Sequence, residues 1–140
     1  MIVVLIIALL AAFALPEYSE QIRKARRSDA VDALLDCAAA QTRHYTTASP
    51  PSYLTQAQAD TPAISVCNMG VSKEGHYNIA ITNPNCSSNG GSVNWCFLLT
   101  ATPVGGQASD TQCSTMTIDH RSLKVASDGT NDTTDLCWRT

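Results

Sequence analysis

The sequence predicts an α+β fold in which one long N-terminal helix packs on a small antiparallel β-sheet, with a disulfide-closed C-terminal loop. Three observations support this fold class. The first third of the chain has apolar residues at helical spacing, the second half has short segments rich in β-branched and aromatic residues, and the six cysteines form an even set. A length of 140 residues is sufficient for one domain with a modest core.

The chain begins with an apolar stretch from Met1 to Leu15 that contains no charged residue. At about 1.5 Å per residue it covers roughly 22 Å of helix, which is shorter than the ~30 Å hydrocarbon core of a bilayer. Ala11, Ala12 and Ala14 favour close helix–helix packing, because small side chains let backbones approach each other. We expect either a shortened membrane span or a helix buried in protein. A cleaved signal peptide is disfavoured, since its basic segment and A-x-A-like site are not found.

Helical spacing continues after this stretch, with residues of one face recurring at steps of three, four and occasionally five. Pro16 has no amide hydrogen and its ring crowds the preceding turn, so we expect a helix break or kink near Ala12 to Leu15. One helix is predicted from Met1 to about Thr46, with residues 1–27 as a stalk and residues 28–140 as a globular domain. Its predicted buried face consists of Tyr18, Ile22, Ala25, Ala30, Leu34, Cys37, Ala38, Gln41 and Tyr45.

A loop and an antiparallel meander are expected after the helix. The segment from Thr46 to Pro62 contains three prolines and several hydroxyl side chains, which is typical of a loop. Hairpin turns are expected at Asn89-Gly90-Gly91 and at His120-Arg121, and the tail is expected to be loop as far as Leu136. The predicted strands are His76–Ile81, Val93–Thr102, Cys113–Asp119 and Ser122–Ala126.

The cysteines predict three disulfide bonds formed outside the cytoplasm. No two of them have CxxC spacing and no CxxCH motif occurs, which disfavours redox, zinc and haem sites. Six cysteines allow about 15 complete pairings, and their spacing leaves the choice open.

A basic cluster on the helix is followed by acidic residues, although the net charge of −3 gives no general field that favours nucleic acid. Two interpretations are open. The charges form a solvated face with pairs three and four residues apart, such as Arg26 with Asp29. Alternatively, helices offset along their axis pair the basic cluster of one subunit with the acids of the next. The inter-subunit candidates are Arg23, Lys24, Arg26, Arg27, Asp29 and Asp32.

No sequence pattern points to catalysis, a cofactor or a metal. The chain lacks G-x-S-x-G and H-E-x-x-H motifs and a glycine-rich phosphate loop. Residues 128–135 carry enough oxygen atoms to suggest calcium, but their spacing does not match an EF-hand. His44, His76 and His120 are separated and lack ligand partners at metal-binding spacing. We therefore expect a protein without enzymatic activity.

The stretch MIVVLIIALLAAFALPEY resembles the N-terminal helix of the type IV pilins, with the proline and the following aromatic residue where that family has them. Later segments are similar to the E-type pilins, namely Ala101-Thr102-Pro103, Gln107 to Asp110, Cys113, Met116 to Asp119, Lys124 and Cys137-Trp138. The resemblance implies a pilin fold whose C-terminal loop is closed by Cys113 and Cys137. The other expected pairs are Cys86 with Cys96, which flank the Asn89-Gly90-Gly91 turn, and Cys37 with Cys67.

The resemblance also implies the function, a structural subunit of a bacterial type IV pilus that supports adhesion, twitching motility or DNA uptake. A minor pilin or a type II secretion pseudopilin is the nearest alternative, and a membrane-tethered periplasmic binding domain is the alternative of another class. The expected location is the cell-surface filament, with the inner membrane before assembly. The expected partners are other copies in a helical filament, minor pilins, and DNA or host surfaces. Residues expected to pack in the filament core are Met1, Ile2, Val3, Val4, Leu5, Ile6, Ile7, Leu9, Leu10, Phe13 and Leu15.

Overall fold

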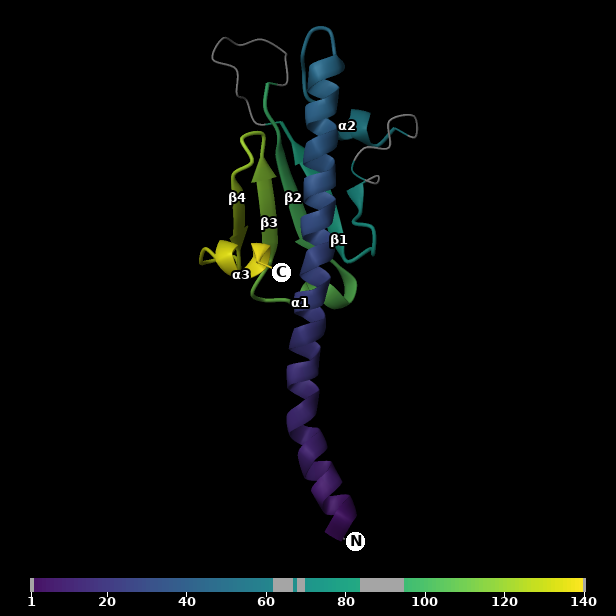
Figure 1. Cartoon of the computed structure of the whole chain (residues 1–140), viewed down its shortest axis with the longest axis vertical. Coiled ribbons are helices and arrows are strands. Elements are labelled where there is room, and N and C mark those ends of the chain that lie inside the picture. The colour runs from purple at the N-terminus through teal and green to yellow at the C-terminus, as the bar shows by residue number, and fades with distance from the viewer. Residues whose placement is uncertain (1, 62–66, 68–69, 84–94, 140) are drawn as a thin grey trace.

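A computed structural model describes residues 2–61, 67, 70–83 and 95–139 of the chain. One long helix lies against a four-stranded antiparallel sheet, and the N-terminal part of the helix projects beyond the sheet (Figure 1). This arrangement confirms the predicted α+β fold. The helices are α1 (Ile2–Thr47), α2 (Gln56–Ala59) and α3 (Thr134–Trp138), with the 3-10 helix η2 at Gly105–Ser109. The strands are β1 (Tyr77–Thr82), β2 (Leu98–Pro103), β3 (Thr115–Asp119) and β4 (Lys124–Ser127).

Helix α1 has a projecting half and a packed half (Figure 1). In the packed half, Ala30, Leu34, Cys37 and Gln41 are fully buried, at the spacing of three and four residues that places them on one face. Tyr18, which the sequence pattern placed on the same face, is exposed because it precedes the part of the helix that the sheet covers. Ala25 is exposed as well, so the buried face is narrower than predicted.

The helix is not interrupted at Pro16, and the break predicted there is not observed. A proline removes one backbone hydrogen bond, but the turns on either side keep theirs and the helix continues, with a gentle curve in its projecting half (Figure 1). Within the part of the chain that the structure describes, no helix is both long and apolar enough to cross a membrane.

The sheet has the strand order β1-β2-β3-β4, so each strand pairs with its neighbour in the sequence. The register places Ala80 opposite Thr100, and Thr100 opposite Thr117. Alternation of the side chains gives the sheet one buried face and one face toward solvent. The core on the buried face includes Tyr77, Ile79, Ile81, Leu99, Ala101, Met116, Ile118 and Ala126.

Strand β2 starts later than the sequence predicted. Its predicted start at Val93 and the turn at Asn89-Gly90-Gly91 lie outside the described residues, and the observed strand begins at Leu98. The backbone just before it bonds to loops instead of a strand partner. The carbonyl of Phe97 accepts a hydrogen bond from the amide of His120 (3.1 Å), and the carbonyl of Cys96 accepts one from the Asn83 side chain (3.2 Å).

Two short helices overlap segments that the sequence predicted as loop: α2 lies within one of them, and α3 begins in the tail before Leu136, where the predicted loop ends. Helix α2 is stabilised by a capping box, in which the side chains of Thr55 and Gln58 bond reciprocally to each other's backbone amides. Helix α3 lies in the C-terminal tail and buries Cys137. The turn between β3 and β4 falls at His120 and Arg121, as predicted.

The described part of the chain contains two disulfide bonds, Cys37–Cys67 and Cys113–Cys137. Both are the pairs implied by the resemblance. The first ties the packed half of α1 to the segment after α2, and the second ties Cys113, two residues before β3, to α3, closing the C-terminal loop. The expected partner of Cys96, Cys86, lies outside the described residues.

The outer edges of the sheet carry hydrogen bonds from neighbouring side chains. At the β1 edge, the amide of Ile81 donates to the side-chain oxygen of Gln56 (2.6 Å). At the β4 edge, the amide of Ala126 donates to Thr134 Oγ1 (2.8 Å), and Trp138 Nε1 donates to the carbonyl of Val125 (3.2 Å). The short helices α2 and α3 therefore hold the groups that cover the two edges.

Candidate functional site

The projecting half of α1 displays apolar side chains outside the domain. Ile2 is 78% exposed, Val3 67% and Ile6 50%. Soluble monomers rarely expose several large apolar residues together, and such surfaces mark contact with protein or lipid. Met1 lies outside the described residues, as do the side chains of the other predicted core-packing residues, Val4, Leu5, Ile7, Leu9, Leu10, Phe13 and Leu15.

A buried ion pair fixes α1 to the domain at the point where the packed half begins. Arg27 donates from Nε and Nη2 to the two oxygens of Asp110 at 2.7 and 2.8 Å, and both side chains are 1% exposed. Arg27 Nη2 also donates to the side chain of Gln112 (2.9 Å). The two-pronged geometry matches a guanidinium to a carboxylate, which gives a strong and directional contact. Arg27 therefore pairs within its own chain, and its prediction as an inter-subunit residue is wrong.

The pairing with Asp110 governs the protonation of both groups. Burial alone would lower the pKa of Arg27, but the hydrogen bond and negative charge of Asp110 outweigh burial, so the pKa is raised. Burial alone would raise the pKa of Asp110, but the hydrogen bond and charge of Arg27, with backbone amides from Gln112 and Cys113, bring the pKa below its ordinary value. Both groups are thus held in their charged forms.

Gln107, in η2, joins this ion pair to the sheet and to α1. Its Nε2 lies 3.0 Å from Asp110 Oδ2, 3.0 Å from the Tyr77 hydroxyl and 3.1 Å from the carbonyl of Arg23. Burial raises the pKa of Tyr77 to about 12, although the hydrogen bond from Gln107 acts in the opposite direction. The helix is therefore held from Arg23 onward, about one turn before the start of the predicted globular domain at residue 28.

Asp29 forms a second attachment on the side of the helix that faces β1. Its carboxylate accepts hydrogen bonds from Ser72 Oγ (2.6 Å) and from the backbone amides of Glu74 (3.0 Å) and His76 (3.4 Å). Asp29 is buried, so it too was wrongly predicted as an inter-subunit residue. The alternative pair of Arg26 with Asp29 is not among the ion pairs of the described residues.

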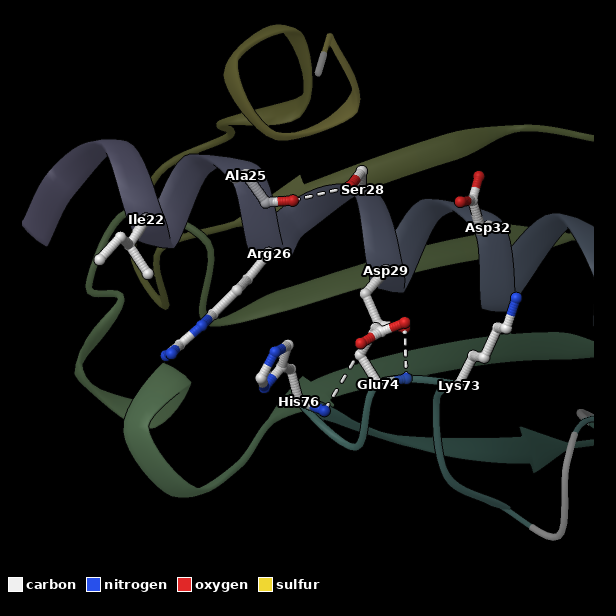
Figure 2. A pocket seen from close by; sticks show the side chains of 9 residues that line it. All are labelled: Ile22, Ala25, Arg26, Ser28, Asp29, Asp32, Lys73, Glu74 and His76. Carbon is white, nitrogen blue, oxygen red and sulfur yellow. Dashed lines mark hydrogen bonds between the residues drawn. The ribbon is translucent and has the colours of Figure 1, made fainter.

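A pocket of about 450 Å³ lies between α1 and the turn that precedes β1. Figure 2 shows Arg26 and Lys73 toward its two ends, with Asp29 and His76 between them. The full lining is Ile22, Ala25, Arg26, Ser28, Asp29, Asp32, Lys73, Glu74 and His76. The mixture of positive and negative groups is suited to charged side chains of a partner rather than to an apolar ligand.

The other predicted charge residues keep access to solvent. Arg23 pairs with Glu20 (3.1 Å) on the helix surface. Lys24 and Asp32 are exposed and Arg26 is half-buried, and none of these three forms an ion pair with the rest of the described chain. The sequence reasoning missed the partners of the buried charges, Asp110 and the Ser72 turn. Only the proximity of Arg27 and Asp29 to the buried helix face could have indicated that they needed partners.

The histidines and the acidic tail have ordinary structural surroundings. His44 Nδ1 lies 2.9 Å from the carbonyl of Ser52. Asp128 accepts hydrogen bonds from the backbone amides of Thr130 and Asn131, each at 2.7 Å, which is typical of a turn. Within the described residues there is no group of three or more histidine, cysteine or acidic side chains arranged to hold a metal ion.

Comparison with known proteins points to a family. Residues 16–117 match the model of a family described as "Type IV minor pilin ComP, DNA uptake sequence receptor". A solved structure described as "High-Resolution Structure of a Type IV Pilin from Shewanella oneidensis" is similar, with 25% sequence identity and a TM-score of 0.51. The similarity covers 84% of this chain and 99% of that chain. No curated protein matches the sequence.

Proposed function

This chain belongs to the ComP family of type IV minor pilins, and from that premise we propose that it is a pilus subunit with a structural rather than an enzymatic role. The observation that carries the proposal is the projecting half of α1, where Ile2, Val3 and Ile6 are exposed. Water disfavours such a surface, and packing against other helices or lipid removes it from water.

The two environments are proposed to apply in succession. Before assembly, the projecting half lies in the inner membrane, and after assembly it packs against the corresponding helices of other pilins inside a cell-surface filament. The alanines of Met1–Leu15 support close packing, because small side chains let helices approach. The family match favours a minor subunit, present at low abundance in filaments built mainly from another pilin.

Replacement of exposed apolar residues by acids tests this assembly. An Ile2→Asp, Ile6→Asp variant is expected to be lost from sheared filaments, as measured by mass spectrometry, because a buried helix contact does not accept unpaired carboxylates. The control is Thr42→Asp, Thr46→Asp, which adds the same charges at exposed positions of the packed half. Equal amounts of the Ile variant and the wild type in filaments would contradict the proposal, provided that circular dichroism shows both proteins folded.

The family description favours a second function, binding of DNA at the filament surface. Exposed basic side chains occur near strand β4, where Arg121 is 73% and Arg139 81% exposed, and Lys124 Nζ lies 4.9 Å from the centre of the Trp138 ring. Arginine and lysine on a surface contact phosphates, and each such contact makes affinity dependent on salt. We propose these three cations as phosphate contacts.

DNA binding is tested with a fluorescent duplex and an Arg121→Ala, Lys124→Ala variant. The affinity is expected to fall, and the slope of log affinity against log salt to become shallower by about 0.9 for each phosphate that no longer has a cation beside it. Arg43→Ala, an exposed cation at the far end of α1, is the control and leaves the slope unchanged. The same slope for the double variant and the wild type would remove Arg121 and Lys124 from the proposal.

A further inference from the structure

The turn between β3 and β4 presents an apolar side chain between two cations. Leu123 is 57% exposed, and of the described residues outside α1 it is the most exposed large apolar one. Arg121 and Lys124, which are proposed above as phosphate contacts, lie on either side of it in the sequence and are exposed as well. This arrangement is suited to a ligand that offers apolar surface and anionic groups close together, as the bases and phosphates of DNA do.

The Asp119 carboxylate fixes the shape of this turn. It accepts hydrogen bonds from the backbone amides of Arg121 (2.8 Å) and Leu123 (2.9 Å) and from Arg121 Nε (3.2 Å). Burial alone would raise the pKa of Asp119, but the bonds from the amides of Leu123 and Arg121 and from the Arg121 side chain bring the pKa below its ordinary value. The carboxylate is therefore charged at neutral pH and holds Leu123 in a preformed turn, so that binding does not have to order it.

Ser122, next to Leu123, has a backbone conformation that residues other than glycine rarely adopt. Its φ of 64° lies in the left-handed region. Such a conformation costs free energy and is kept where surrounding contacts impose it, which is often at a binding site. Here the amide of Ser122 donates to the carbonyl of Asp119 (2.9 Å), and the amide of Asp119 donates to the carbonyl of Leu123 (3.1 Å). The turn thus keeps an unfavourable conformation directly before the exposed leucine.

The order of cation, apolar residue and cation matches the minor groove of DNA. That groove is about 6 Å wide with phosphates along both borders, and proteins that enter it frequently insert an apolar side chain between base pairs. At most about 11 Å of backbone separates Arg121 from Lys124. We propose that Leu123 enters the minor groove and partly unstacks a base step, while Arg121 and Lys124 contact the phosphates on its two sides. This inference rests on the proposed DNA binding and adds a residue that contacts the bases.

The position of the turn leaves it accessible in an assembled subunit. It lies at the end of the sheet away from the projecting half of α1 (Figure 1), so packing of that half among other helices does not cover it. A lipid surface is the other ligand with apolar and anionic groups. Binding to lipid increases with the apolar area that is buried, whereas a wedge in the minor groove requires a single side chain. One leucine between two cations therefore favours DNA.

The experiment uses the detergent-solubilised full chain and a duplex rich in TA steps that carries 2-aminopurine at one of them. TA steps kink easily, and 2-aminopurine becomes more fluorescent when it leaves the base stack. The wild type is expected to raise this fluorescence, and netropsin, which occupies the minor groove, is expected to displace the protein. Leu123→Ala is expected to lower the affinity about tenfold and to abolish the fluorescence increase. The slope of log affinity against log salt stays unchanged in this variant, because no cation is lost.

Two variants serve as controls for Leu123→Ala. Leu123→Met keeps an apolar side chain of similar volume and is expected to retain the fluorescence increase. Leu35→Ala removes a leucine that is 40% exposed on α1, and it is expected to leave both affinity and fluorescence unchanged. The inference is overturned if Leu123→Ala binds and unstacks like the wild type, if the wild type does not raise the fluorescence, or if netropsin does not displace it.

The failure of this inference is distinguishable from failure of the proposed DNA binding. A salt-dependent affinity that falls in the Arg121→Ala, Lys124→Ala variant, together with no effect of Leu123→Ala, overturns the inference and leaves the phosphate contacts standing. A wild-type chain that does not bind the duplex at low salt overturns both. Vesicles of phosphatidylethanolamine and phosphatidylglycerol provide the last measurement. If Leu123→Ala weakens binding to these vesicles but not to the duplex, Leu123 contacts lipid and the inference is overturned.

Discussion

Helix α1 is one continuous element whose two halves are stabilised in different ways. The packed half places Leu34 and Arg27 in the interior, where apolar contacts and a buried ion pair join it to the sheet. The projecting half exposes Ile2 and Ile6 and has no sheet beside it. Changes in the packed half should therefore alter the folding of a single chain, and changes in the projecting half should alter only its association.

The largest expected loss of stability comes from Asp110→Ala in the packed region. Removal of the carboxylate leaves the Arg27 guanidinium buried without its partner, which costs about 3–5 kcal/mol of unfolding free energy. Urea unfolding followed by circular dichroism measures the change. Asp36→Ala, at an exposed position on the same helix, is the control and is expected to stay within about 0.5 kcal/mol of the wild type. A loss for Asp110→Ala no larger than that of this control would show that the ion pair does not hold the helix.

Leu34→Ala and Ile6→Ala compare the two halves directly. Leu34 is fully buried, so its truncation leaves a cavity and costs about 3 kcal/mol. Ile6 is half exposed in a single chain, so the same kind of truncation costs less than about 0.5 kcal/mol. The measurement is denaturant unfolding of the detergent-solubilised full chain. Equal losses of unfolding free energy for the two variants would show that the packed and projecting halves contribute alike to the stability of a single chain.

The next largest expected loss of stability occurs at alkaline pH and depends on the proton of Tyr77. Its pKa is about 12 in the folded chain against 10.0 for an ordinary tyrosine, so the unfolded chain loses the proton first as the pH rises. The stability that depends on this proton is complete below pH 10 and is lost between pH 10 and about 12, by about 2–3 kcal/mol. Tyr77→Phe should flatten that part of the curve of stability against pH, while the exposed control Tyr18→Phe should not.

The smallest expected loss of stability comes from replacing Arg23, which lies one helical turn from Arg27. Its ion pair with Glu20 lies at the surface, where water and salt weaken the attraction, so Arg23→Ala costs about 0.5 kcal/mol or less. Thermal unfolding at low and high salt checks this value. A loss comparable to that of Asp110→Ala would place Arg23 in the same buried attachment as Arg27.

The elements with regular spacing could be predicted from the sequence, whereas the partners of buried polar groups could not. The long helix and the β3–β4 hairpin follow from local patterns, and their boundaries agree with the structure to within a few residues. The contact of Arg27 with Asp110 joins residues 83 positions apart through the path of η2, which no local pattern reveals. The sequence placed Arg27 and Asp29 with the exposed charges because a charged side chain is buried only when a partner is present.

The side chains that cover the two sheet edges have a consequence for a chain proposed to pack beside other pilin subunits. A sheet edge with unbonded amides and carbonyls can recruit a strand from a neighbouring molecule, which leads to domain exchange or irregular aggregation. In this chain, the amide of Ile81 donates its hydrogen bond to Gln56. On the other edge, the amide of Ala126 donates to Thr134, and the carbonyl of Val125 accepts from Trp138. These backbone groups are therefore not free to bond a strand of a neighbouring molecule, which disfavours the joining of sheets between domains that touch.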